Sequence, residues 1–232
     1  MNRTKSVWKM HNRDQMTWFY LPWAILIFSF VINLCIAYFV TSDQTDYIHV
    51  TGGIASIFGY LMVVGYMLLP HSFSYVLNNS IRRKDYFWGT TAMITAVALF
   101  TSIVLTALGA VESRVTGGWG IGMRFFDLPY LSNGHALEQV WVYFSLIIHL
   151  FYVGFLHSSF YHRFRRKGMY IAIFILIGAG TIGSYLMTYY HGWVKLYEWF
   201  IQYPLSQHAV WIFATAVLYA LLSYFMLRRS TI

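Results

Sequence analysis

Histidine, cysteine and carboxylate side chains are the groups in this chain that could bind a cofactor or carry out acid–base chemistry. The sequence contains nine His residues, one Cys and eight acidic residues. His149 and His157 are eight residues apart, which places both near one face of a helix. Paired axial His ligands on membrane helices can hold haem, but the site needs an inward-facing His on a second helix. The sequence offers only His49 and His208 for that role, and both stand at the ends of other apolar segments.

The motifs of membrane hydrolases are absent from the sequence. It contains no His-Glu-x-x-His and no Gly-x-Ser-x-Gly. The run from Gly118 to Gly122 is similar to a fragment of a nucleotide-binding loop, but it lacks the flanking strand and helix that such a loop needs. The long apolar segments contain almost no acidic residues, which argues against a proton-coupled transporter with a carboxylate relay. We therefore do not expect the chain to be an enzyme by itself.

The segment from Pro70 to Gly89 is too apolar and too basic for a simple polar turn. Pro70 is expected to end an apolar helix. We predict that this segment contains a short helix, with an apolar face and a charged tip, that projects into the cytoplasm and docks a partner. The residues expected to contact that partner are His71, Phe73, Tyr75, Arg82, Arg83, Lys84 and Asp85. Alternatively, the basic residues of this segment supply only orienting charge and contact phospholipid headgroups.

The distribution of charged residues predicts how the chain is oriented in a membrane, and therefore on which side this segment lies. Thirteen of the sixteen Lys and Arg residues fall in four clusters, at 3–13, 82–84, 163–167 and 228–229, and these clusters alternate with acidic turns. Lys and Arg are retained in cytoplasmic loops during membrane insertion. Hydrophobic residues make up 58% of the chain and charged residues 10%. The pattern predicts a cell-membrane protein with both termini in the cytoplasm. The net charge of +8 therefore reports orientation, and no nucleic-acid partner is expected.

The apolar segments predict an all-α polytopic membrane protein with a single transmembrane domain over residues 1–232. A helix that crosses a bilayer needs about 20 mostly apolar residues. Six segments satisfy this requirement: residues 18–40, 48–69, 88–111, 139–160, 169–190 and 208–226.

Three further segments lie outside these six spans. Residues 6–16 are expected to form an amphipathic N-terminal interfacial helix, or else a short basic tail. Residues 191–207 are too amphipathic for an ordinary loop, so we predict a re-entrant or interfacial outer helix between spans 5 and 6. The outer segment 112–138 is long and its role is not predicted. Pairs of small residues, such as Ala55/Gly59 and Ala179/Gly183, are expected to mark helix–helix contacts.

The run Ile-Arg-Arg-Lys-Asp-Tyr-Phe-Trp-Gly-Thr at residues 81–90 resembles a motif of the ABC-2 type permease subunits of small Gram-positive ABC exporters. In those subunits the stretch before the third span often reads as a basic-aspartate-aromatic run ending in Gly-Thr. The six-span layout, the N-terminal interfacial helix and the outer element between spans 5 and 6 are also similar to that family. In size and layout the chain resembles the phenol-soluble modulin exporter permeases.

This resemblance implies that residues 71–85 form the coupling helix, which inserts into a groove on an ATP-binding cassette ATPase subunit. The chain lacks a Gly-x-x-x-x-Gly-Lys-Ser/Thr loop, so ATP and Mg are expected on that separate subunit. The resemblance further implies a second permease copy or homologue, a surrounding membrane lipid, and an amphipathic or hydrophobic peptide as cargo. Two alternatives from other classes are a haem-binding b-type membrane cytochrome and a non-transporting membrane scaffold or sensor.

Overall fold

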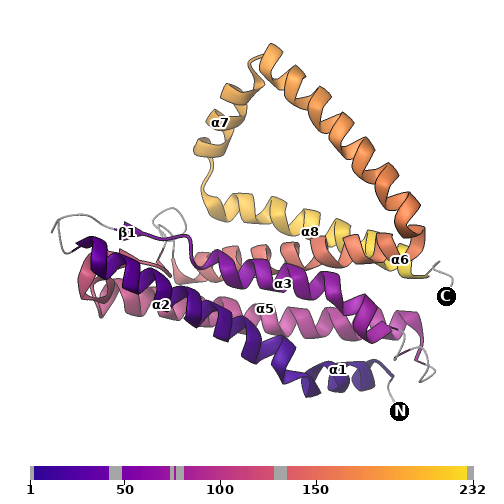
Figure 1. Ribbon diagram of the computed structural model, residues 1–232, viewed down its shortest axis with the longest axis horizontal. Coiled ribbons are helices and arrows are strands. Elements are labelled where there is room, and N and C mark those ends of the chain that lie inside the picture. Colours follow the sequence, from indigo (N-terminus) through magenta and orange to yellow (C-terminus); the bar gives the residue numbers. More distant parts are fainter. Residues whose placement is uncertain (1–2, 42–48, 74–75, 77–80, 128–134, 229–232) are drawn as a thin grey trace.

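The computed structural model describes residues 3–41, 49–73, 76, 81–127 and 135–228, and nearly all of them are helical (Figure 1). Within these residues, five helices are long and apolar enough to cross a membrane. They are Met16–Phe39, Ala55–Phe73, Arg83–Arg114, Ala136–Tyr189 and Leu205–Arg228. The described part of the chain is thus predominantly helical, and its long apolar helices are those of a multi-pass membrane protein.

The N-terminal part of the chain forms two helices joined at a bend. Helix α1 spans Arg3–Arg13, and helix α2 spans Leu21–Thr41 after the π-helical turn η1 at Met16–Tyr20. At the bend, a side-chain oxygen of Asp14 accepts a hydrogen bond from the backbone N–H of Thr17 at 3.4 Å. Figure 1 shows α1 turned away from the direction of α2. Asp14 therefore satisfies a backbone donor at the start of the first long apolar helix.

Helix α3, Ala55–Leu68, continues through Pro70 into the π-helical turn η2, Leu69–Phe73. The expectation that Pro70 ends the helix is wrong for this reason. A proline ring clashes with the carbonyl of the preceding turn in a regular α-helix. A π-helical turn widens the backbone locally and accommodates the ring. The helix consequently reaches Phe73, beyond the predicted end of the second span.

Helix α5 spans Arg83–Arg114, so it begins five residues before the predicted third span. Arg82 is its N-cap, with extended φ and ψ of −70° and 145°. Lys84 and Asp85 therefore lie in the first turn of a membrane-length helix rather than at the end of a separate short one. The acidic side chain of Asp85 in the first turn is favourable, because its negative charge lies close to the positive N-terminal end of the helix dipole.

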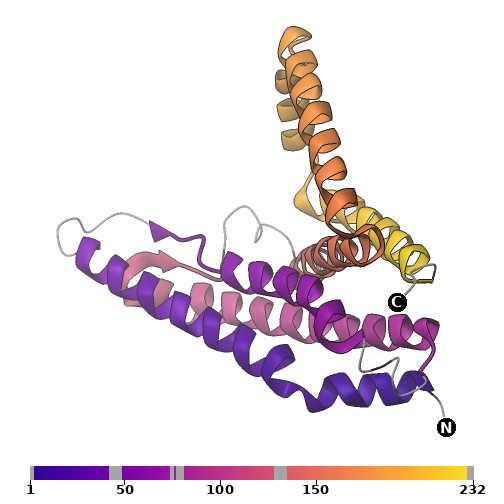
Figure 2. The same ribbon diagram turned by 45° about the vertical axis from the view of Figure 1, so that its right-hand side comes forward.

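Helix α6 spans Ala136–Tyr189 and has two arms that meet at Arg165, whose φ of 58° and ψ of −166° are not helical. A straight helix of this length would measure about 80 Å, far more than the thickness of a bilayer core. Figure 2 shows that the second arm leaves the bundle formed by α2, α3, α5 and the first arm. The bend lies within the basic cluster at 163–167. Helices α7, Gly192–Gln202, and α8, Leu205–Arg228, then return the chain to the bundle.

Two short strands pair at the end of the bundle that lies opposite the start of α1 and the end of α8 (Figure 1). β1, His49–Val50, pairs in parallel with β2, Met123–Arg124. The N–H of Thr51 also donates to the carbonyl of Arg124 at 3.0 Å. This pairing joins the segment before α3 to the long outer segment that follows α5.

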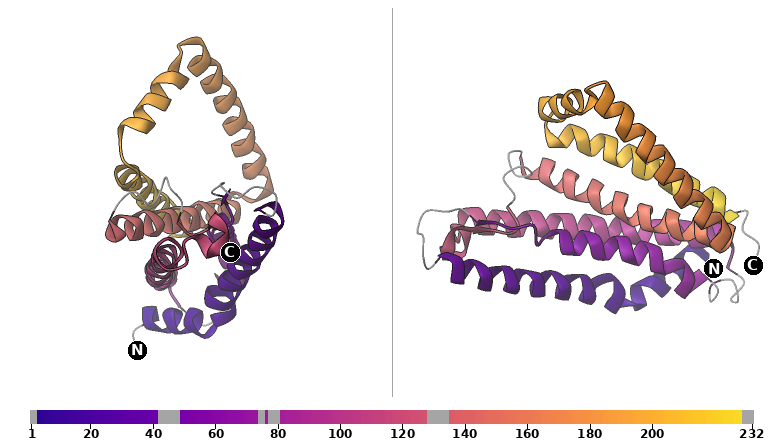
Figure 3. Two further views of the ribbon diagram at one scale, coloured as in Figure 1. Left: turned by 90° about the vertical axis from the view of Figure 1, so that its left-hand side faces the viewer. Right: turned by 45° about the horizontal axis from the view of Figure 1, so that its top comes forward.

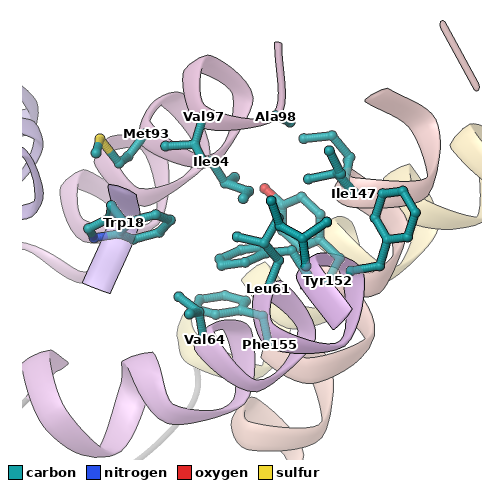
Figure 4. Packing of buried hydrophobic residues seen from close by; sticks show 14 of the residues in the cluster. Trp18, Leu61, Val64, Met93, Ile94, Val97, Ala98, Ile147, Tyr152 and Phe155 are labelled. Carbon is teal, nitrogen blue, oxygen red and sulfur yellow. The ribbon is translucent and has the colours of Figure 1, made fainter. Parts of the chain in front are cut away.

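The hydrophobic core lies where α3, α5 and the first arm of α6 meet the start of the first long helix. Figure 4 shows the closely packed side chains of Trp18, Leu61, Ile94 and Phe155 from these four elements. Aromatic rings contribute much of the packing, and Phe151 stacks on Phe155 with 5.8 Å between ring centroids. Burying large aromatic rings is the main stabilising contribution of such a core.

Helices α3 and α6 approach most closely at Gly65 and Gly154. A Cβ atom at Gly154 would overlap the carbonyl oxygen of Met62, and one at Gly65 would overlap the carbonyl oxygen of Phe151. By contrast, a Cβ at Gly59 or at Gly183 would meet nothing within 4 Å. The predicted contact role of the Ala55/Gly59 and Ala179/Gly183 pairs is therefore wrong within this chain. Pairs of small residues permit two helices to approach closely, but they do not determine which helix will pack against them.

Candidate functional site at the basic end of the bundle

The N-terminal helix, the start of α5, the bend of α6 and the end of α8 all lie at one end of the bundle (Figure 3, right). We call this the basic end, because it carries the cluster on α1, Arg82–Lys84, the cluster at 163–167 and Arg228. The described residues of the segment for which a partner was predicted from sequence lie here.

Helix α1 packs across the first turns of α5. The hydroxyl of Thr4 donates to a carboxylate oxygen of Asp85 at 3.4 Å. Val7 is fully buried, and its side chain would lie 2.6 Å from a Cβ at Gly89. No other residue at position 89 would allow this approach without a shift of one helix. The aspartate and the glycine of the predicted motif are therefore contact residues for α1.

His11 completes the contact between α1 and α5. Its Nε2 atom lies 3.1 Å from the hydroxyl oxygen of Thr90, and its ring lies edge-on to Trp18 with 5.5 Å between centroids. The side chain is buried, and the resulting desolvation lowers its pKa to about 4, against a smaller opposing effect of the Asp14 charge. His11 is therefore neutral at physiological pH and acts as a hydrogen-bonded core residue.

The residues predicted to contact a partner do not share one exposed surface. His71, Arg82 and Lys84 are exposed, whereas Arg83 and Asp85 are half-buried. Phe73 is buried at 1% exposure. Tyr75 lies outside the described residues, as do 74 and 77–80, so the middle of the predicted coupling helix falls outside the part of the chain that the structure describes.

Phe73 holds this segment to the bundle instead of facing outward. Its ring lies 5.4 Å from that of Tyr86 and 5.2 Å from that of His162, both in edge-to-face arrangements. The hydroxyls of Ser72 and Tyr86 share a hydrogen bond of 2.8 Å. Burying an apolar side chain against aromatic rings is favourable, and this explains why Phe73 faces the bundle. The chain between α3 and α5 is thus held firmly at its start.

A cavity of about 580 Å³ opens between the start of α5 and the end of α8. Four cationic side chains from two distant parts of the sequence line it, with three apolar side chains beside them. The lining residues are Ile81, Arg82, Arg83, Lys84, Tyr224, Leu227 and Arg228. Positive charge therefore dominates the polar part of this cavity's wall.

A second cavity, of about 440 Å³, lies between the end of α1 and the face of α3. Its walls are mostly apolar and include Met10, Val64 and Met67, while His11 and Asp14 provide polar groups. It has the composition of a small hydrophobic-ligand pocket.

The two His residues considered for haem have different neighbours. Nδ1 of His149 lies 3.2 Å from the carbonyl oxygen of Ile212 and 3.1 Å from the hydroxyl of Thr215, both on α8. The ring of His157 instead packs against Tyr66 of α3 at 5.2 Å. Within the described ranges, no group of three or more His, Cys, Asp or Glu side chains could hold a metal ion. The two imidazoles therefore do not face a common space.

Glu112 organises the outer segment and was not singled out from the sequence. It is fully buried, and its carboxylate accepts hydrogen bonds from the indole N–H of Trp119 at 2.7 Å and from the backbone N–H of Phe125 at 2.9 Å. The backbone N–H groups of Phe126 and Asp127 donate to it as well. An acidic residue near the C-terminus of a helix is unfavourable for the helix dipole. Glu112 could have been singled out from the sequence by its position, because it stands near the end of an apolar helix and just before a glycine-rich run whose backbone N–H groups need acceptors.

Comparisons with protein-family models, with curated proteins and with solved structures find no match for this chain.

Proposed function

We propose that the chain is the membrane permease subunit of an ATP-driven ABC-2 type exporter that moves amphipathic or hydrophobic peptides out of a bacterial cell. The single observation that carries the proposal is the basic end. There the aspartate and glycine of the resembled motif anchor an N-terminal helix, and exposed cations stand beside them. In this account ATP and Mg bind a separate ATPase subunit, and the chain itself has no catalytic site.

In this proposal the chain crosses the plasma membrane six times, with both termini in the cytoplasm. The bend at Arg165 supports six crossings, because it divides α6 into two arms at a basic cluster. The start of α1 and the end of α8 lie at the same end of the bundle, which supports an even number of crossings (Figure 3, right). Helices α1 and α7 would then lie at the inner and outer interfaces respectively.

The ATPase would dock on the exposed part of the predicted segment, which includes His71, Arg82 and Lys84. Force applied there would reach α5 directly, because Arg82 is the N-cap of that helix. It would also reach α1 through the contact between Thr4 and Asp85. ATP can shift the permease between conformations only through a difference in the affinity of the ATPase for the two states.

A second permease copy or a homologue would complete the transport pathway. The second arm of α6 supports this requirement, since large apolar side chains such as Phe174 and Leu176 are more than 70% exposed. Six helices also enclose too small a bundle to surround a peptide-sized path. Amphipathic cargo fits the apolar and aromatic character of the helices.

Co-purification with candidate ATPases of the same cell tests the proposal. We expect the unmodified chain to retain one ATPase, and an Arg82→Ala/Lys84→Ala variant to lose most of it. An Arg166→Ala/Lys167→Ala variant removes the same charge from exposed positions at the bend and should retain the ATPase. If no ATPase associates, or if both double variants lose it equally, the docking assignment is wrong.

A further inference from the structure

The cavity between α1 and α3 is elongated. It follows α3 and the turn after it from Tyr60 to Ser72, while α1 and the turn that follows it line the other side from Met10 to Thr17. The stretch from Tyr60 to Ser72 corresponds to a length of about 18 Å. The volume of about 440 Å³ is that of a small-molecule site. An α-helix of the same length would need about 1,400 Å³, so the cavity is too small for a helical peptide.

Apolar side chains form most of the wall of this cavity. Val64 and Leu68 belong to the hydrophobic core, with 4% and 7% of their surface exposed. Met10, Val63 and Met67 also line the cavity. Methionine side chains are flexible and adapt to apolar groups of different shapes. An occupant that contacts this wall therefore has an apolar body.

Asp14 gives the cavity a negative charge. It is the only acidic residue among the described residues that line the cavity, and these include no Lys or Arg. The backbone N–H of Thr17 donates to one of its carboxylate oxygens at 3.4 Å. A carboxylate can accept about four hydrogen bonds, so Asp14 is able to accept further donors beside this one. The imidazole of His11, which also lines the cavity, is neutral because it is buried.

We propose that this cavity binds a single-chain organic amine, with its ammonium group on the carboxylate of Asp14 and its alkyl chain along Val64 and Met67. Hydrogen bonds between an ammonium and a carboxylate are charge-assisted and roughly twice as strong as neutral ones. A fatty acid or a phospholipid would instead bring an anionic group close to Asp14, which is unfavourable. The bound amine joins α1 to α3, because the two walls of the cavity belong to these helices.

The inference does not depend on an ATPase partner, because Asp14, Val64 and Met67 lie outside the segment proposed to dock the ATPase. The test is native mass spectrometry of the detergent-purified chain, titrated separately with decylamine, decanol and decanoate. These three compounds share one chain length and differ in the charge of the head group. We expect decylammonium to bind the unmodified chain at least about tenfold more tightly than decanol, and decanoate to bind more weakly than both.

The head-group preference is tested with Asp14→Asn, which keeps an acceptor for the N–H of Thr17 but removes the charge. It should weaken the binding of decylammonium on the order of tenfold and leave the binding of decanol unchanged. Glu138→Gln is the matched control, because it removes an exposed carboxylate from the first turn of α6, away from the cavity. It should bind both compounds like the unmodified chain.

The location of the site is tested with Met67→Trp, which places a larger side chain in the cavity at a position that is 47% exposed. This variant should fold and lose the binding of both decylammonium and decanol. Three outcomes would overturn the proposal: no preference for decylammonium in the unmodified chain, equal losses in Asp14→Asn and Glu138→Gln, or unchanged binding by Met67→Trp. The first two would show that Asp14 does not select the ligand, and the third would place the binding outside this cavity.

Discussion

Acidification should release helix α1 from the bundle, because its buried His11 would have to become charged in place. In the docked state the pKa of His11 is about 4, and burial is the main cause. When α1 undocks, the imidazole meets water and its pKa returns to about 6.5. The undocked state therefore binds more protons between these two values. Docking is fully stable above about pH 6.5 and weakens as the pH falls towards 4.

The expected size of the effect follows from the two pKa values. At pH 5 the docking equilibrium should shift by about 30-fold towards the undocked state, which corresponds to about 2 kcal/mol. The effect should approach about 3 kcal/mol at still lower pH. Nearly all of the loss should fall on α1, since the contacts of Thr4, Val7 and His11 with α5 break together.

Hydrogen exchange in lipid nanodiscs, measured by mass spectrometry at pH 7.5 and pH 5, reports this undocking. After correction for intrinsic exchange, the amides of α1 should exchange about 30-fold faster at pH 5 in the unmodified chain. A His11→Gln variant keeps a group that can hydrogen-bond Thr90 but cannot take up a proton, so its corrected rates should hardly change. Equal acceleration in both proteins, or none in either, would refute the assigned role of His11.

Three further substitutions test other parts of the structure. Glu112→Gln should destabilise the outer segment by about 2 kcal/mol, because an amide cannot accept all of the hydrogen bonds that the carboxylate accepts. Thermal unfolding monitored by Trp fluorescence would measure this loss, and an unchanged unfolding midpoint would contradict it. Gly154→Val should destabilise the bundle by at least about 3 kcal/mol, whereas Gly59→Ala should have little effect in the same unfolding assay; equal effects would argue against the close approach of α3 and α6. Arg165→Gly should stabilise the chain by about 1 kcal/mol by relieving a positive φ, and Lys167→Gly should not; stabilisation by both would show that backbone geometry is not the cause.

The helical class and the approximate positions of the long helices could be predicted from the sequence, because apolar length and charge clusters are local properties. The ends of helices were less predictable. Pro70 was expected to end α3, but a π-helical turn accommodates it. The start of α5 was placed at Trp88, yet the helix begins at Arg83 because hydrophobicity marks where a helix enters the membrane and not where it begins.

The candidate site was only partly predictable for a related reason. The sequence pointed to residues 71–85, but it could not show which of them face outward, since that depends on neighbours distant in sequence. Phe73 is buried by Tyr86 and His162. The motif residues Asp85 and Gly89 instead contact α1. Glu112 was missed because its backbone donors at Phe125 and Asp127 follow the short strand β2 and are not marked by any periodicity in the sequence.

The most direct test of the proposed function is ATP-dependent transport by the chain together with its co-purifying ATPase. Inside-out membrane vesicles containing both proteins would be supplied with a fluorescent amphipathic helical peptide. We predict that ATP drives accumulation of the peptide in the vesicles, and that Arg82→Ala/Lys84→Ala abolishes accumulation while Arg166→Ala/Lys167→Ala does not. If vesicles containing both proteins take up no more peptide with ATP than without it, at any peptide concentration tested, the proposed role as an exporter of amphipathic peptides is contradicted.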